Sequence, residues 1–169
     1  MHGRKTPYYL VLAALFAAAI TVATAYILHI PLPTGGYIHL GDALIYLAGC
    51  LLPLPWAMAA AAIGAAAADL LTAPLWAAAT LLIKALVVLP FTSRAGRILC
   101  RRNVLAVLIA GVFSPTAYGL AGCLLMGSPA AFLPQFAGTL IQAAGRGAVF
   151  LILGAALDRG RLKQRLGHS

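Results

Sequence analysis

Three polar side chains lie close together in the segment 33–44, which reads PTGGYIHLGDAL and separates two long apolar stretches. They are Tyr37, His39 and Asp42. An aromatic ring, an imidazole that is neutral near pH 7 and a carboxylate suit the binding of a small heteroaromatic molecule. Plainer roles stay open: His39 as a solvated loop side chain, and Asp42 as the N-cap of the helix that follows Gly41.

Three further charged side chains lie within or at the edge of apolar stretches: Asp69, Lys84 and Arg146. Such charges are costly in a membrane and normally face one another or a polar cavity. Together with Asp42 they sum to zero, and an ion pair between Asp69 and Lys84 is the plainest arrangement. Arg146 lies between two glycines, and we expect it to face a polar cavity or a partner protein. All six side chains are candidate substrate-binding residues.

The elements that position these residues must be membrane helices. The chain has 169 residues, of which 63% are hydrophobic and only 9% charged, whereas a soluble domain has about a quarter of its residues charged. Apolar windows of about 17 to 24 residues recur, each long enough to cross a hydrocarbon core. They do not alternate apolar and polar residues as barrel strands would. The fold class is therefore an all-α integral membrane protein.

Turn residues divide the chain into six predicted transmembrane helices within a single domain, 1–169. The first apolar stretch is too long for a typical signal peptide core, so we expect it to be a retained helix. Basic tails are expected at 1–7 and 158–169. The predicted spans are approximately 8–30, 42–53, 56–71, 74–90, 104–126 and 136–157.

The positions of the cations give the predicted orientation. With six spans, ten of the 12 Lys and Arg residues fall on one side of the membrane. Because cytoplasmic loops carry an excess of Lys and Arg, we expect both termini to be cytoplasmic and the segment 33–44 to face outside. This clustering at the membrane flanks argues against a nucleic-acid partner, despite a net charge of +9. The ten are Arg4, Lys5, Arg94, Arg97, Arg101, Arg102, Arg159, Arg161, Lys163 and Arg165.

Several activities have no motif in this chain. Cys50, Cys100 and Cys123 are scattered, without the spacing of a zinc site or a disulfide framework. The sequence also lacks a phosphate-binding P-loop, an HExxH pair, a GxSxG elbow and a dinucleotide fingerprint. We therefore expect no catalytic residues, metal or bound cofactor. If ATP drives transport, another chain must hydrolyse it.

Small residues four positions apart run along the first predicted helix, among them Ala13, Ala14, Ala17 and Ala18. Small residues at this spacing let helix backbones approach closely in lipid. Two explanations remain open here: packing within the six-helix bundle, or a smooth face that slides against a partner membrane protein.

The segments PTGGYIHLGDALIYLAG, AAIGAAAADLL and APLWAAATLLIKAL resemble the substrate-binding S components of energy-coupling factor (ECF) vitamin transporters. The likeness is to the subgroup with HLGDA at the entry of the second helix and an IKG-like motif in the fourth. It covers about 8–90; the rest of the chain agrees in size and topology. Ala85 stands where that motif has glycine, which puts a tight helix contact there in doubt.

The resemblance implies a six-helix bundle with an outward-facing pocket and a loop that closes over the ligand. It implies that Tyr37, His39 and Asp42 belong to the gate, with Pro33, Thr34, Gly35 and Gly36 as its hinge. It also implies that Ala13, Ala14, Ala17 and Ala18 dock on a transmembrane T subunit powered by two cytoplasmic ATPases, which use the ATP.

The expected function is capture of a vitamin or vitamin precursor outside a bacterial or archaeal cytoplasmic membrane, followed by release inside. Within the resembling subgroup the ligands include flavins, hydroxymethylpyrimidine, pyridoxine-like compounds and queuosine precursors. An alternative is a self-contained secondary transporter or channel that uses Asp69, Lys84 and Arg146 as an ion path. A membrane enzyme or assembly factor is a third class, for which the chain has no recognisable catalytic set.

Overall fold

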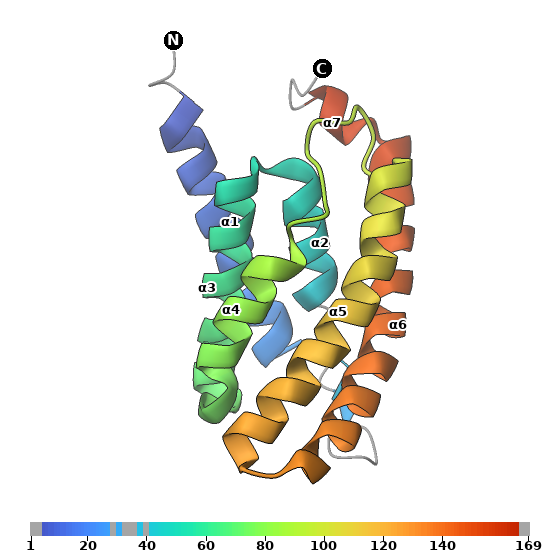
Figure 1. Ribbon diagram of the computed structural model, residues 1–169. Helices are drawn as coiled ribbons and strands as arrows, with labels where there is room; N and C mark the ends of the chain where they lie inside the picture. The colour runs from blue at the N-terminus through green and yellow to red at the C-terminus, as the bar shows by residue number, and fades with distance from the viewer. Residues whose placement is uncertain (1–4, 28–29, 32–36, 39–40, 166–169) are drawn as a thin grey trace.

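The structure is a computed structural model that describes residues 5–27, 30–31, 37–38 and 41–165. Helices dominate the described chain and lie side by side along one direction (Figure 1). In chain order the elements are α1 (Lys5–Ala25), β1 (Ile30–Pro31), β2 (Tyr37–Ile38), α2 (Gly41–Leu51), α3 (Leu54–Thr72), η1 (Pro74–Trp76), α4 (Ala77–Val87), α5 (Arg101–Met126), η2 (Pro129–Ala131), α6 (Phe132–Arg159) and α7 (Leu162–Arg165).

The exterior of this bundle is apolar. Four helical stretches of the described chain are long and apolar enough to cross a membrane: Thr6–Ala25, Leu54–Thr72, Arg101–Met126 and Pro129–Arg159. Large apolar side chains on them face outward, with Leu124 on α5 85% exposed and Leu133 on α6 69% exposed. Contiguous apolar surface of this kind needs hydrocarbon around it. Two shorter apolar helical stretches, Gly41–Leu51 and Pro74–Val87, complete the set.

Each of the six predicted spans contains a helix, but the first prediction runs too far. The helix α1 ends at Ala25 and not near residue 30. Ile30 and Pro31 instead pair in antiparallel fashion with Ile38 and Tyr37. The apolar run continues past Ala25, and hydropathy alone does not mark where a helix stops. The short helix α7 inside the basic tail was also not predicted.

A close helix contact joins α1 to α3 at Gly64. A Cβ at this position would lie 2.7 Å from the carbonyl oxygen of Ala17. Glycine therefore allows the two helix backbones to approach each other this closely. The Thr21 hydroxyl of α1 donates to the Gly64 carbonyl oxygen over 2.9 Å. This is the small-residue packing that replaces the hydrophobic effect between helices in lipid.

The helices α5 and α6 form a hairpin. Along each helix, buried residues recur every three to four positions and so share one inward face. Most of these inward residues are small, which lets the two helices pack closely along their length. On α5 they are Asn103, Ala106, Ala110, Ser114, Pro115, Gly119 and Gly122. On α6 they are Thr139, Ala143, Arg146, Gly147, Phe150 and Gly154.

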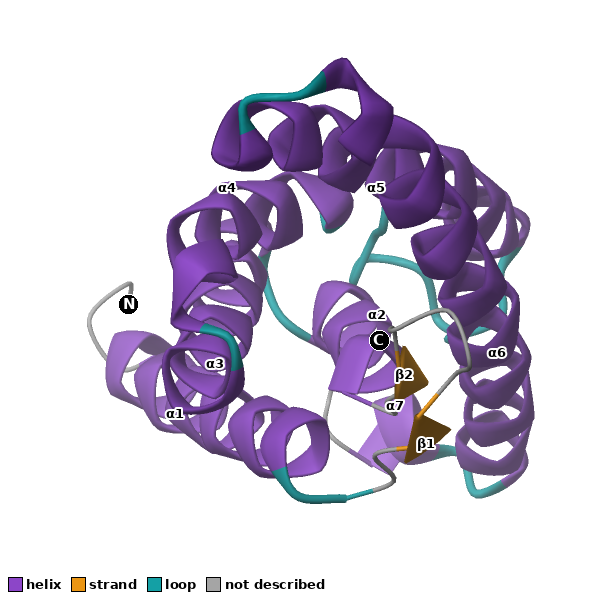
Figure 2. Ribbon diagram, turned by 90° about the horizontal axis from the view of Figure 1, so that it is seen from below, coloured by secondary structure: helices purple, strands orange, loops and turns teal. Residues whose placement is uncertain are grey.

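The helix α2, with 11 residues, is shorter than α1, α3 and α6, and it packs against all three. Its 11 residues rise about 16 Å, and it begins about halfway along the bundle (Figure 1). The strand β2 packs against α6, and Figure 2 shows the strand pair near α2 and α6 in the end-on view. All of α2 except Leu44 is buried. Tyr46 of α2 stacks on Phe91, with ring centroids 4.9 Å apart. The first turn of α2 is therefore held inside the bundle.

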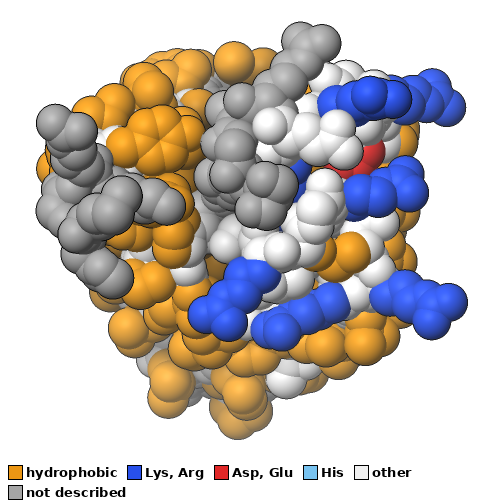
Figure 3. Space-filling view, turned by 90° about the horizontal axis from the view of Figure 1, so that it is seen from above, with side chains coloured by type: hydrophobic (Ala, Val, Ile, Leu, Met, Phe, Trp, Pro, Cys, Tyr) orange, Lys and Arg blue, Asp and Glu red, His pale blue; other side chains and the backbone are white. Residues whose placement is uncertain are grey.

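One end of the bundle is basic, and polar contacts fasten the α4–α5 connection there (Figure 3). The Asp158 carboxylate of α6 accepts from the backbone N–H groups of Ile98 and Leu99, over 2.7 and 2.9 Å. Lys163 of α7 donates to the carbonyl oxygens of Ser93 and Ala95 over 3.0 and 2.7 Å. The C-terminal part of the chain thus clamps residues 93–99.

Burial lowers the pKa of the Lys163 ammonium from its ordinary value of 10.5, against the opposing effect of nearby Cys50, Cys100 and Asp158. The folded chain therefore releases this proton more readily than the unfolded chain does. By linkage, the contribution of Lys163 to stability rises as the pH passes through its lowered pKa toward 10.5.

Asp158→Asn should destabilise the protein, because an amide has one acceptor oxygen and its NH2 group would face the other backbone N–H. We expect the free energy of unfolding in detergent to fall by about 1–3 kcal/mol. The control is Arg97→Gln: Arg97 pairs with Asp158 at 4.0 Å but its side chain is 78% exposed, so its loss should cost little. Equal destabilisation by the two variants would contradict the clamp.

Candidate functional site

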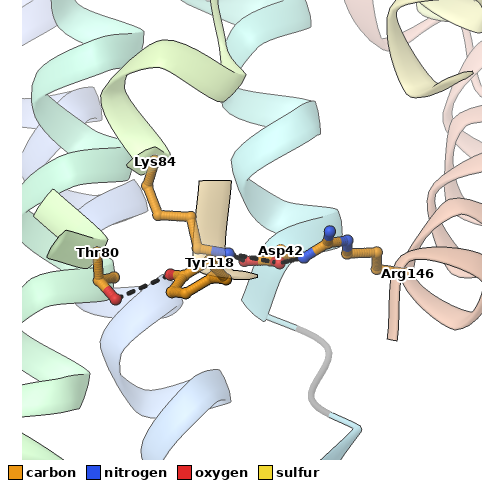
Figure 4. A network of polar contacts seen from close by, with 5 residues as sticks. All are labelled: Asp42, Thr80, Lys84, Tyr118 and Arg146. Carbon is orange, nitrogen blue, oxygen red and sulfur yellow. Dashed lines mark hydrogen bonds and ion pairs between the residues drawn. The ribbon is translucent and has the colours of Figure 1, made fainter. Parts of the chain in front are cut away.

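Three charged side chains from three helices meet inside the bundle (Figure 4). The Asp42 carboxylate of α2 accepts from the Lys84 ammonium of α4, with Nζ 2.8 Å from Oδ1 and 2.7 Å from Oδ2. It also forms an ion pair with Nη1 of Arg146 on α6. The side chains of Asp42, Lys84 and Arg146 are 3%, 5% and 2% exposed. We call these three residues the charged network.

The residues next to Asp42 explain why its side chain lies inside the bundle. A Cβ at Gly41 would overlap the hydroxyl of Thr24 on α1, so glycine lets the first turn of α2 lie against α1. Asp42 follows as the second residue of α2. A carboxylate is favourable at this end of a helix, where the backbone N–H groups carry partial positive charge.

Two polar side chains and an aromatic ring support Lys84. The Thr80 hydroxyl, one turn before Lys84 on α4, lies 2.8 Å from the Tyr118 hydroxyl of α5. The Tyr118 ring centroid is 5.2 Å from Lys84 Nζ, within the range of a cation–π contact. Trp76 lies beside it, with ring centroids 6.0 Å apart. The network therefore has two aromatic rings next to its charges, with their planes tilted by 50°.

Arg146 is the least satisfied member of the network. Its Nε and Nη2 are buried and have no hydrogen-bond partner among the described residues. Both atoms are donors on one planar guanidinium group and suit paired acceptor atoms. A buried donor left without a partner costs free energy, so these atoms are the part of the site that a ligand with oxygen or nitrogen acceptors would satisfy.

The charges of the network do not cancel. One carboxylate faces two cations, so the formal sum over Asp42, Lys84 and Arg146 is +1. Asp69, near the end of α3, is half-buried and lies near the Thr80 hydroxyl. Within the described chain Lys84 pairs with Asp42, so the expected Asp69–Lys84 ion pair is wrong. Asp69 borders the network without joining its ion pairs.

Of the two remaining predicted ligand contacts, Tyr37 and His39, only Tyr37 lies within the described residues. Tyr37 is in β2, and this strand packs against α6, which carries Arg146. His39 lies outside the described residues, and so does the predicted hinge. The hinge consists of Pro33, Thr34, Gly35 and Gly36.

The four predicted docking residues of α1 divide between two faces. Ala13 is buried, and Ala17 contacts Gly64 of α3. Ala14 and Ala18 are exposed and lie on one face with Val11 and Val22. Internal packing thus explains Ala13 and Ala17, whereas Ala14 and Ala18 are available to a partner.

Thr80 and Tyr118 are site residues that the sequence did not single out. Hydroxyl and aromatic side chains are common within membrane helices, so neither draws attention alone. A signal was present in their spacing: Thr80 precedes Lys84 by four residues, and positions four apart share a helix face.

Comparison with known proteins gives one match. A family model described as ECF-type riboflavin transporter, S component, matches residues 5–159. This range takes in α1 to α6 and the whole charged network. No curated protein and no solved structure matches the chain. The described residues contain no group of three His, Cys, Asp or Glu side chains placed to hold a metal ion.

Asp42→Asn should be far more destabilising than Lys84→Met. The first variant leaves two buried cations without a counter-ion, which costs about 3–5 kcal/mol. The second leaves an Asp42–Arg146 pair whose charges cancel. Thermal unfolding in mild detergent measures both, with Asp69→Asn as the carboxylate control. If Lys84→Met were as damaging as Asp42→Asn, the carboxylate would not be the centre of the network.

Proposed function

The chain belongs to the family of S components of ECF-type riboflavin transporters, and from this premise we propose that it captures a small heteroaromatic vitamin outside the cell for import. As a member of this family it is a substrate-binding transport subunit of a membrane and not an enzyme. The match is to the family as a whole, so the HLGDA subgroup stays a prediction. The observation that carries the proposal is the charged network with its unsatisfied Arg146 donors.

We propose six membrane crossings with both termini in the cytoplasm of a bacterium or archaeon. The basic end of the bundle supports this orientation, because Arg97 pairs with Asp158 and Lys163 donates to carbonyl groups of the α4–α5 connection there, and cations favour the cytoplasmic side. The strand pair then lies toward the outside, between the external solution and the charged network.

The chemistry of the network favours a planar ligand with adjacent acceptors. Nε and Nη2 of Arg146 can donate together to a ring nitrogen and its neighbouring carbonyl oxygen, a pair that the pyrimidinedione ring of a flavin presents. The rings of Tyr118 and Trp76 provide a surface for stacking. We therefore propose a flavin as the preferred ligand. Pyridoxine-like compounds, hydroxymethylpyrimidine and queuosine precursors are the next candidates. The excess positive charge also suits an electron-rich ligand edge.

We propose that transport depends on a T subunit and two ATPases, which use the ATP. The exposed face with Ala14 and Ala18 is the surface we assign to the T subunit. On this face Ala14 and Ala18 lie between Val11 and Val22 along the helix, and both alanines are exposed. Such a surface lets another helix approach and slide.

Uptake of radiolabelled riboflavin by cells that express this chain tests the proposal. We expect uptake only when a T subunit and its ATPases are co-expressed, because this chain has no phosphate-binding loop. Ala14→Leu with Ala18→Leu should reduce uptake to background while the purified protein still binds riboflavin.

The matched control is Ala144→Leu with Ala148→Leu, which adds the same bulk to two exposed alanines four residues apart on α6. It should leave uptake unchanged. Uptake that persists in cells without the partner subunits would instead support a self-contained secondary transporter. Equal loss of uptake in the α1 and α6 variants would remove the docking assignment.

A further inference from the structure

A cavity with polar lining residues lies at the basic end of the bundle, and none of the charged network lines it. Its volume is about 680 Å³, within the range of about 300–1,000 Å³ typical of small-molecule sites. The turn between α2 and α3 forms one wall, Tyr9 of α1 another, and the connection after α4 a third. Two cations line it, Arg94 from that connection and Arg102 from the first turn of α5.

An apolar groove adjoins this cavity on the side that faces lipid. Its volume is about 240 Å³, and Leu89 lines both the cavity and the groove. Leu89 is 43% exposed, so the junction is open. The remaining groove residues are all apolar and come from α4, α5 and the turn after α4: Leu86, Val87, Pro90, Ile109, Ala110 and Phe113.

Arg102 stands where the cavity and the groove meet. Its Nε donates to the carbonyl oxygen of Pro90 over 3.1 Å, and Pro90 lines the groove. This bond fixes the guanidinium at the junction and leaves its terminal amino groups for an anion. Tyr9, Thr92 and Ser93 line the same cavity, and each carries a hydroxyl group that can form hydrogen bonds.

We propose that this composite site binds an anionic phospholipid, with its phosphate at Arg94 and Arg102 and one acyl chain in the α4–α5 groove. A soluble anion would use the cavity alone and leave the groove without a role. A phospholipid matches both parts, because its charged and apolar halves are joined as the two parts are joined at Leu89. The basic end of the bundle lies where headgroups meet exposed apolar helix surface, the depth at which such a lipid is found.

Lipid occupancy would join three separate pieces of the bundle. The cavity walls come from α1, from the α2–α3 turn and from the α4–α5 connection, which α7 clamps at Ser93 and Ala95. A headgroup held between them would bridge segments that are distant in sequence. The bound lipid is thus expected to stabilise the folded protein against thermal unfolding.

Native mass spectrometry of the full chain in mild detergent tests the site, with phosphatidylglycerol and phosphatidylcholine of the same acyl chains as probes. We expect phosphatidylglycerol to bind more tightly. Arg94→Gln and Arg102→Gln should each weaken its binding about fivefold. The matched controls are Arg97→Gln and Arg101→Gln, which remove the same charge from the same region without lining the cavity. They should change the affinity by less than about twofold.

The groove is tested separately. Ile109→Ser should weaken phosphatidylglycerol binding, whereas Leu108→Ser, an exposed neighbour outside the groove, should not. Equal losses in the cavity and control arginine variants would overturn the site in favour of diffuse attraction to the basic face. Glycerol 3-phosphate that binds as tightly as phosphatidylglycerol would also overturn it, because the groove would then contribute nothing. All variants are checked for an unfolding temperature within the range of the wild type.

Discussion

The structure depends on one buried carboxylate shared by two cations from different helices. Asp42 joins α2 to α4 through Lys84 and to α6 through Arg146, and all three side chains are almost fully buried. In a low-dielectric interior such charges are tolerable only when paired and hydrogen-bonded. The pairing is incomplete, since one positive charge and two Arg146 donors remain unmatched within the described chain. A resting protein that keeps this imbalance at its centre is suited to a ligand that removes it.

The rest of the bundle places this carboxylate. Because α2 is short, its first turn lies about halfway along the bundle (Figure 1). Gly41 lets that turn lie against α1. Gly64 brings α3 close to the same helix, so α1 is fixed from two sides. At the other end, Asp158 and Lys163 hold the connection between α4 and α5. The two helices that supply Lys84 and the Tyr118 ring are thereby kept in position.

Much of this could be predicted from the sequence, and the failures have physical reasons. Apolar length predicted the helices, and the cost of burying charge singled out Asp42, Lys84 and Arg146 one by one. Their pairing could not be derived, because Lys84 and Arg146 lie 42 and 104 residues from Asp42 and only the packed bundle brings them together. The expected partner of Lys84 was Asp69 instead, because helical rise puts both side chains on neighbouring spans within reach of a lysine stem. The end of α1 was also misplaced, since an apolar run continues in Ile30 after the helix has stopped.

Small molecules carried through purification in mild detergent give the most direct test of the network as a ligand site. We predict that mass spectrometry finds one heteroaromatic compound with adjacent acceptor atoms on the wild-type chain. Arg146→Met should lose that compound, although Asp42 and Lys84 still form a pair whose charges cancel and the protein stays folded. If the wild type retained no compound, or if Arg146→Met retained the same one, the charged network would not be the binding site.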